Sequence, residues 1–364
     1  MRGGGGRWRT VNGARGARRE TAGSGPERTV RHMGGGRRMD AGLRRELDEK
    51  VRGGERLSRE DGLALYGSDD LAWLGDLAHE ARTRRHGDAG YFSVSRGLVL
   101  ADGSGVEEAV RHAAALGADG VTELRVGIGQ GLDRDACTSA LRALREAAPG
   151  IALRACTAAD VHRFETATGL SADEILAELV DAGLESFTAD AGPGEDGWED
   201  WSRIHRLAHA KGLKTPAALL LDRDRDLPHR VDDLLRLREL QDETGGFPVF
   251  APLGGALTGL EILKTFAVSR LLLDNVPHLA ACWATHGERA ALLALQHGAD
   301  EVDASFVNAQ ESSDAPAEPT RDDLLDLVRD AGFRPVERDA RYEVVREHEG
   351  ADPGRRDAPQ PMRV

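Results

Sequence analysis

Cysteine is scarce in this 364-residue sequence, which contains only Cys137, Cys156 and Cys282. Neither a disulfide framework nor a C-x-x-C metal site fits them, because such sites repeat cysteines at short, regular intervals. We expect thiols in the core or at strand ends. No cysteine precedes Cys137, so the first 136 residues cannot contribute a thiolate ligand.

Long apolar runs and an excess of basic charge are also missing. No stretch approaches the ~18 consecutive apolar residues of a membrane span, and no early segment is typical of a secretory signal. We therefore expect a cytoplasmic protein that contacts no membrane. The formal net charge of −14 argues against a nucleic-acid surface, which depends on clustered Lys and Arg. A small-molecule ligand is expected instead.

Residues 1–38 differ from the rest of the chain. They hold ten Arg and two Glu among many glycines and show no apolar periodicity, so we expect a disordered leader. Two interpretations are open. The leader is an RNA-binding arm, or it precedes the true start of translation at Met33 or Met39; we favour the second.

The remaining chain alternates short apolar runs with helical patterns. Capping boxes, in which a hydroxyl stands three residues before a carboxylate, predict helix starts at Ser58, Ser104, Ser171 and Thr258. Eight predicted strands lie at 91–98, 121–128, 151–157, 184–190, 213–221, 247–253, 275–283 and 299–307. Such alternation is typical of parallel strands with right-handed crossovers. No G-x-G-x-x-G motif follows a first strand to support the alternative, an open doubly wound sheet.

These patterns predict an α/β protein built on a (β/α)8 TIM-type barrel. Short helices over 39–90 precede the barrel, which spans 91–310. A helix and strand over 311–346 extend it, and 347–364 form a disordered tail. In such a barrel the loops after the strands build the active site. The first of these loops, 96–103, contains no Cys, His or Glu.

Several segments carry a family resemblance, among them LLRLRELQDETGGF, LLLDNVPHLAACW and PVERDARYEVV. Over about residues 54–345 the chain resembles aminofutalosine synthase, a radical S-adenosylmethionine (SAM) family of the futalosine route to menaquinone. The resemblance implies a radical SAM barrel, a [4Fe-4S] cluster and SAM.

The sequence departs from the family's pattern in three loops. The family holds its cluster with C-x-x-x-C-x-x-C after the first strand, and the matching segment 96–103 has no Cys. The Gly-rich SAM segment corresponds to 188–194, and the loop after the sixth strand shrinks to 254–256. Cys137 is expected outside the barrel, with Cys156 and Cys282 on opposite strands. We therefore expect no cluster, and SAM binding is in doubt.

The candidate site residues are few. Asp160 and His162 are candidates for an acid and base pair, with Thr157 beside them as a substrate-binding candidate. A helix cap at Asp160 is the simpler alternative. Gly127 and Gly129 offer backbone N–H groups to an anion, although a tight turn explains them equally well. Asp190 and Trp283 complete the substrate-binding candidates, and no spacing predicts a metal site.

Two functional hypotheses follow. In the first, the chain is a catalytically degenerate member of the aminofutalosine synthase family that binds a small molecule, or pairs with an intact paralogue or a second copy. In the second, it is a non-radical barrel enzyme, or a binding protein, for a nucleoside-like or carboxylate ligand, with Asp160 and His162 as its acid and base.

Overall fold

A computed structural model describes residues 39–100, 105–116, 120–129, 131–189, 192–193, 197–221, 226–254, 257–303 and 319–350. The expected leader at 1–38, most of the expected tail and the candidate Asp190 lie outside these residues. None of the helices in the described ranges is long and apolar enough to cross a membrane.

Three helices precede the first strand: α1 (Ala41–Gly53), α2 (Arg59–Tyr66) and α3 (Leu71–His86). The predicted capping box at Ser58 is confirmed, since Ser58 and Asp61 exchange reciprocal hydrogen bonds at the start of α2. The last turn of α3 lies against the segment that leads into β7 (His278–Cys282). There Arg85 donates to the carbonyls of Asp274 and Val276.

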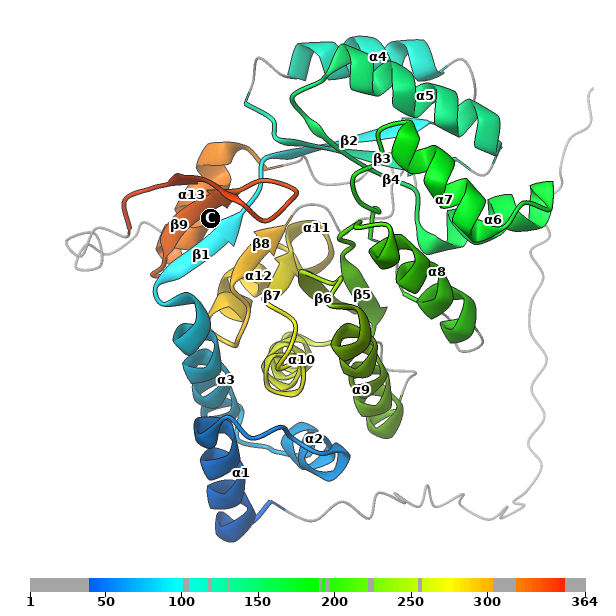
Figure 1. The fold of residues 1–364 in the computed structure, drawn as a ribbon. Coiled ribbons are helices and arrows are strands. Elements are labelled where there is room, and N and C mark those ends of the chain that lie inside the picture. The colour runs from blue at the N-terminus through cyan, green and yellow to red at the C-terminus, as the bar shows by residue number, and fades with distance from the viewer. Residues whose placement is uncertain are drawn as a thin grey trace, which may run out of the picture. The chain divides into compact units, whose positions relative to one another are not determined.

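After these helices most strands are followed by a helix, as predicted, although β1 leads directly to β2 and α6, α7 and α8 follow one another (Figure 1). The strands are β1 (Ala89–Phe92), β2 (Ser95–Leu100), β3 (Glu123–Ile128), β4 (Ala152–Ala155), β5 (Ala217–Leu220), β6 (Val249–Leu253), β7 (His278–Cys282), β8 (Glu301–Asp303), β9 (Arg334–Arg338) and β10 (Val344–Glu347). The helices are α4 (Gly105–Leu116), α5 (Arg134–Ala147), α6 (Ala158–Thr168), α7 (Ala172–Asp181), α8 (Trp198–Ala210), α9 (Leu227–Thr244), α10 (Gly259–Leu272), α11 (Trp283–His286), α12 (Glu288–Leu295) and α13 (Arg321–Asp330).

Within the described residues the strands pair in two groups, β10-β9-β1-β8-β7-β6-β5 and β2-β3-β4, and among these pairs only β9–β10 is antiparallel. The predicted first strand is divided. β1 pairs with β8 and β9, whereas β2 pairs with β3 from Ser95 opposite Glu123 onward. The division arises because β9 occupies the edge of β1 on which a continuous strand would meet β3.

The predicted fourth strand is reduced to one bridge between Arg154 and Ser186. On its other side the Ser186 hydroxyl donates to the carbonyl of Lys214 at 2.6 Å. A side chain, rather than a ladder of backbone hydrogen bonds, thus joins this segment to the chain before β5. The arrangement is a TIM-type α/β fold, as predicted, with a weakened ladder at this seam.

Alternating strand residues face the helices or the barrel interior. Phe250, Leu279 and Val302 belong to the main core between strands and helices. A separate small cluster contains Ala218, Val249, Ala251, Leu253, Ala280 and Cys282. Because side chains alternate along a strand, this second set lines the interior. Figure 1 shows α4 and α5 over β2–β4, and α8, α9 and α10 beside β5–β7.

Candidate functional site

Asp160 is held at the start of α6 by a capping box with Thr157. Its Oδ2 accepts hydrogen bonds from the backbone N–H and the hydroxyl of Thr157, both at 2.9 Å. Arg163 Nη2 donates to Oδ1 at 3.0 Å. Both carboxylate oxygens are therefore engaged in local hydrogen bonds that begin the helix.

His162 faces away from this cap. Its side chain is about half exposed, and Nδ1 lies 3.6 Å from Glu165 and 3.9 Å from Asp200. The structure thus places Asp160 and His162 on one helix without joining them in a hydrogen bond. Their role as an acid and base pair stays a prediction.

The other predicted site residues also lie at strand ends. Gly127 is in β3 opposite Val99, and the N–H of Gly129 donates to Leu100 O at 2.8 Å. That donor is already used in extending the sheet. Trp283 begins the short helix α11 after β7 and packs, half-buried, against the main core.

The three cysteines lie on two sides of the barrel wall. Cys137 in α5 and Cys156 after β4 are both fully buried in the main core, with their sulfur atoms 3.6 Å apart. Cys282 belongs to the interior cluster and accepts a hydrogen bond from Thr285. Cys137 lies outside the strands as predicted. The contact between Cys137 and Cys156 was not foreseen, because the helix position alone did not show which side of α5 carries the thiol.

A cluster of buried charges occupies the barrel interior, and we call it the interior ion-pair cluster (Glu123, Arg154, Glu301, Asp303 and Arg338). Arg338, at the end of β9, pairs with Glu301 and lies 3.5 Å from Asp303 and 3.7 Å from Glu123. Arg154 donates to Glu123 at 2.8 Å. Ion pairs therefore connect four strands, β3, β4, β8 and β9, in the barrel interior.

The pKa shifts in this cluster follow from burial and from its partners. Burial raises the pKa of Glu123, but Arg154 and Arg338 outweigh it and the net shift is downward. The pKa of Glu301 is raised, chiefly by burial with the negative charge of Asp303 adding to it. Glu301 thus keeps its proton to higher pH than a solvated carboxyl. The ion pair with Arg338 opposes this upward shift and holds the Glu301 carboxyl in the cluster.

Tyr342 fills the space beside this cluster. Its ring covers the Arg338 guanidinium at 4.1 Å and stacks on His278 at 5.0 Å. It also packs on the interior cluster of small apolar residues. The turn between β9 and β10 therefore inserts a side chain into the barrel interior.

Sequence reasoning missed the interior ion-pair cluster, although a signal was present. In ELRV, Glu123 and Arg125 alternate with residues of the main core, and Glu301 and Asp303 flank Val302 in the same way. Charged residues at every second position of an otherwise apolar strand face away from the helices. In a barrel that direction is the interior.

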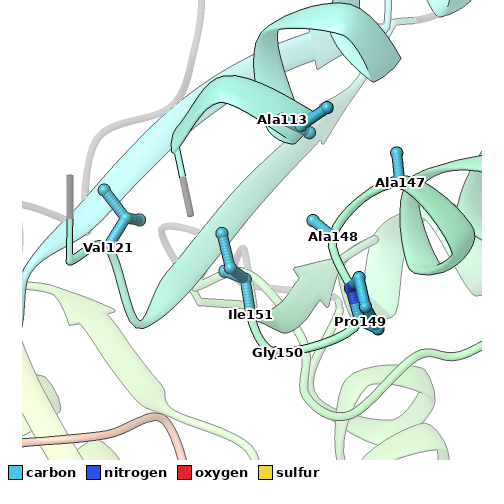
Figure 2. A pocket seen from close by; sticks show the side chains of 8 residues that line it. Ala113, Val121, Ala147, Ala148, Pro149, Gly150 and Ile151 are labelled. Carbon is cyan, nitrogen blue, oxygen red and sulfur yellow. The ribbon is translucent and has the colours of Figure 1, made fainter. Parts of the chain in front are cut away.

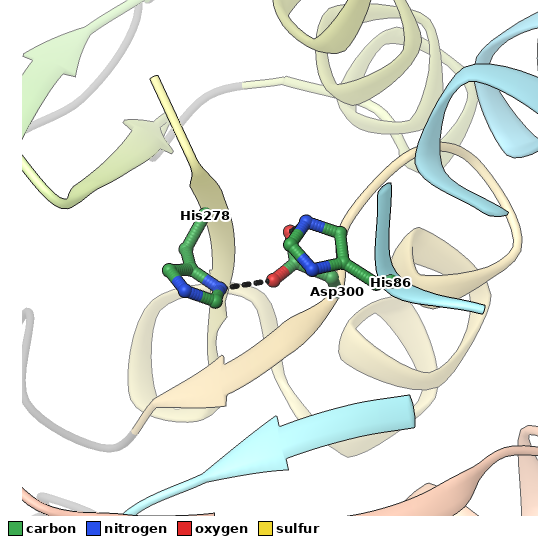
Figure 3. Close-up of side chains that lie close together, drawn as sticks. All are labelled: His86, His278 and Asp300. Carbon is green, nitrogen blue, oxygen red and sulfur yellow. Dashed lines mark hydrogen bonds and ion pairs between the residues drawn. The ribbon is translucent and has the colours of Figure 1, made fainter. Parts of the chain in front are cut away.

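His86, His278 and Asp300 form a second cluster (Figure 3), each offering a ligand atom within 4.8 Å of the others. These atoms already have protein partners. Asp300 accepts from Arg270, from the Leu279 N–H at 2.8 Å and from His278 Nδ1 at 2.6 Å. Burial lowers the pKa of His86 to about 4. The Arg270 guanidinium supplies the positive charge that a metal would bring, so the cluster is structural.

A cavity of about 200 Å³ lies between α4 and the chain leading into β4 (Figure 2). It is lined by Ala113, Ala114, Val121, Ala147, Ala148, Pro149, Gly150 and Ile151. Val121 and Ile151 precede β3 and β4, so the cavity is at the N-terminal ends of the strands. TIM-barrel active sites lie at the opposite end, and this apolar lining offers no catalytic group.

Comparison with known proteins assigns the family. The chain is 50% identical to aminodeoxyfutalosine synthase of Streptomyces coelicolor, covering 88% of this chain and 99% of the relative. The chain belongs to the aminodeoxyfutalosine synthase family. The Thermus thermophilus aminodeoxyfutalosine synthase is 34% identical over 82% of this chain and 95% of the relative. Residues 252–350 match the CofH/MqnC C-terminal region. The family resemblance stated from the sequence is confirmed.

This member of the aminodeoxyfutalosine synthase family is shortened internally. The Streptomyces alignment spans 383 positions, whereas 88% of 364 residues is about 320, so about 60 aligned positions have no residue in this chain. Only four residues separate β2 from α4, and five separate β6 from α10. Both connections are at the C-terminal ends of strands.

Solved structures confirm the fold of this family member. The hydrogenase maturase HydG of Carboxydothermus hydrogenoformans superposes with a TM-score of 0.61 at 13% identity, covering 82% of this chain and 80% of HydG. Methylornithine synthase (PylB) gives a TM-score of 0.60 at 13% identity, covering 79% of this chain and 97% of PylB. These likenesses confirm the predicted TIM-type α/β fold.

Proposed function

We propose that this chain is a catalytically degenerate member of the aminodeoxyfutalosine synthase family that does not assemble the [4Fe-4S] cluster. The observation that carries the proposal is the segment 96–103, which corresponds to the family's cluster motif and comprises most of β2 (Ser95–Leu100) and part of its connection to α4. It contains no Cys, and no Cys precedes Cys137. Three thiolates must converge to hold such a cluster and leave one iron open for SAM.

The remaining thiols do not fit that requirement. Cys137 and Cys156 face each other between α5 and β4, whereas Cys282 lies in the interior cluster. Their sulfur atoms are thus divided between two faces of the strand layer. The family's other cofactor, SAM, binds the open iron, so we propose that it has lost its principal anchor here.

Anaerobic reconstitution with iron and sulfide tests the proposal. The matched control is the variant Cys137→Ser/Cys156→Ser/Cys282→Ser, and the Streptomyces relative, treated in parallel, serves as the positive control. We expect equal background iron in the wild-type chain and the cysteine-free variant. Close to four irons and four sulfides per wild-type chain, lost in the variant, would overturn the proposal.

Without a cluster, the roles that we propose are binding a small molecule and pairing with an intact family member or a second copy. Light scattering after size exclusion, on the chain alone and mixed with the intact relative, measures pairing. A mass that stays monomeric in both samples contradicts pairing. The comparisons favour this family assignment and lend no support to a non-radical enzyme.

A further inference from the structure

Two of the three cysteines form a thiol pair near the mouth of the barrel. Cys137 is the fourth residue of α5, and Cys156 directly follows β4. A crossover helix runs antiparallel to its strands, so the start of α5 and the end of β4 lie at the same end of the barrel. Both thiols are fully buried.

The backbone around Cys156 is held in an uncommon conformation. Cys156 has a φ of 54°, which is uncommon for a residue with a side chain. Its carbonyl accepts two hydrogen bonds from Thr188, from the backbone N–H and from the hydroxyl, each at 2.9 Å. Thr157 then begins α6. These contacts fix the backbone at Cys156, and its sulfur lies 3.6 Å from the sulfur of Cys137 in α5.

The distance between the sulfur atoms permits a covalent link. They are 3.6 Å apart, and a disulfide requires about 2.05 Å. The difference can be closed by side-chain rotation and a small shift of α5. The third thiol is not positioned to compete, because Cys282 faces the interior.

We propose that Cys137 and Cys156 are an oxidation site, at which a peroxide converts the two thiols into an intramolecular disulfide linking α5 to the end of β4. One sulfur attacks a peroxide oxygen, giving a sulfenic acid and water. The second sulfur displaces a second water from that sulfenic acid. Overall, two thiols and one hydrogen peroxide give one disulfide and two waters.

The environment makes this oxidation slow. The pKa of Cys156 is raised by its contact with the Cys137 thiol and by burial, so little thiolate is present near neutral pH. Oxidation also requires a local opening that admits peroxide. The site therefore responds to sustained oxidant and leaves the pair reduced under mild exposure.

Thiol counting on the full chain tests the proposal. After prolonged hydrogen peroxide treatment and removal of the oxidant, the unfolded protein is titrated for free thiols and analysed as peptides by mass spectrometry. We expect one free thiol in place of three and a Cys137–Cys156 cross-linked peptide. The mass of that peptide should be lower by about 2 Da than the summed masses of its two thiol peptides. Dithiothreitol should restore all three thiols.

Matched variants make the outcome decisive. Cys282→Ser should form the same disulfide and lose both remaining thiols, whereas Cys137→Ser should form no intramolecular disulfide. In the wild type, the disulfide should raise the melting temperature reversibly, because it closes a loop of the unfolded chain. Three free thiols after treatment, sulfinic acids in place of the cross-link, or a link through Cys282 would each overturn the proposal. None of these results depends on whether a cluster is assembled.

Discussion

Arg338 is the side chain on which the barrel interior depends most. It is fully buried at the end of β9, where Glu301, Asp303 and Glu123 surround it and Tyr342 covers it. These carboxylates raise the pKa of Arg338 well above its usual value in spite of burial. Breaking a buried ion pair leaves uncompensated charge, which costs more than the pair contributes.

Arg338→Met is therefore expected to lower the free energy of unfolding by about 3–5 kcal/mol. The substitution keeps an unbranched side chain but removes the charge that faces Glu301. Urea unfolding followed by circular dichroism measures the change. Arg341→Met is the control, because Arg341 is largely exposed and pairs with Glu185 at the surface. An equal decrease in the free energy of unfolding for the two variants would show that burial of the Arg338 charge does not cause the destabilisation.

Gly246 illustrates a steric requirement at a single position. A Cβ at this residue would lie 2.1 Å from Cγ of the His209 ring, whereas a Cβ at Gly259 meets nothing within 4 Å. We expect Gly246→Ala to destabilise the protein by about 1–3 kcal/mol. Gly259→Ala should leave the melting temperature nearly unchanged. Thermal unfolding of the two variants side by side gives the comparison, and a stable Gly246→Ala protein contradicts the clash.

Helix α8 is held to the strands by two histidines rather than by apolar contacts alone. His205 Nδ1 and His209 Nε2 each lie 2.8 Å from the Thr215 hydroxyl. A hydroxyl has one proton to donate, so it donates to one ring and accepts from the other. Trp201 and Phe247 pack against His205. The ring that accepts the Thr215 proton must be neutral, and burial disfavours the charged form of both rings.

Stability should consequently fall with pH below about 6.5. Burial lowers the folded-state pKa of His209 from 6.5 to about 4 and that of His205 well below 6.5. The folded protein therefore binds fewer protons than the unfolded protein in this window, so stability is complete above pH 6.5 and lost toward pH 4. We expect a loss on the order of 1–3 kcal/mol for each histidine. Urea unfolding at pH 7, 5.5 and 4.5 measures it, and His209→Gln should flatten the profile. A flat wild-type profile contradicts the mechanism.

Helix α6 supplies a test of the candidate pair on it. Because Asp160 is the N3 residue of the capping box whose N-cap is Thr157, Asp160→Ala should cost about 1 kcal/mol of stability. His162→Ala should change little, because that side chain is half exposed. Denaturation of both variants, with ligand binding measured in parallel, distinguishes a helix-capping role of Asp160 from a ligand-binding role of the pair. Loss of binding in both variants without loss of stability would favour the functional interpretation.

The C-terminal strand β9 connects to the first strand of the barrel and to its interior. β9 pairs along the full length of β1. Arg338, at the end of β9, lies in the barrel interior, and Tyr342 from the following turn lies beside it. The segment after α13 is thus part of the barrel rather than an appendage. Its sequence lies within the matched C-terminal family region, 252–350.

A chain ending at Phe333 should therefore lose cooperative unfolding, because it exposes one edge of β1 and leaves Glu301 and Asp303 without their cation. A chain ending at Gly350 keeps the contacts described here and serves as the control. Calorimetry on both compares the transitions. A sharp transition in the shorter chain would mean that β9 is dispensable.

Much of this could be predicted from the sequence because it depends on local chemistry. The capping boxes at Ser58, Ser171 and Thr258 are confirmed, since a cap needs only residues three positions apart. The division of the first strand at Phe92 could not be predicted. It depends on β9, whose pairing with β1 leaves no periodic signal in either segment.

The sequence by itself determined the alternation of strands and helices, the family and the missing cysteine motif, because periodicity, caps and composition act within a few residues. Only the tertiary structure decided which buried groups meet: Arg338 with Glu301, and Cys137 with Cys156. Those contacts join segments distant in the chain. Their partners are selected by the packing of whole strands and helices, which no local pattern encodes.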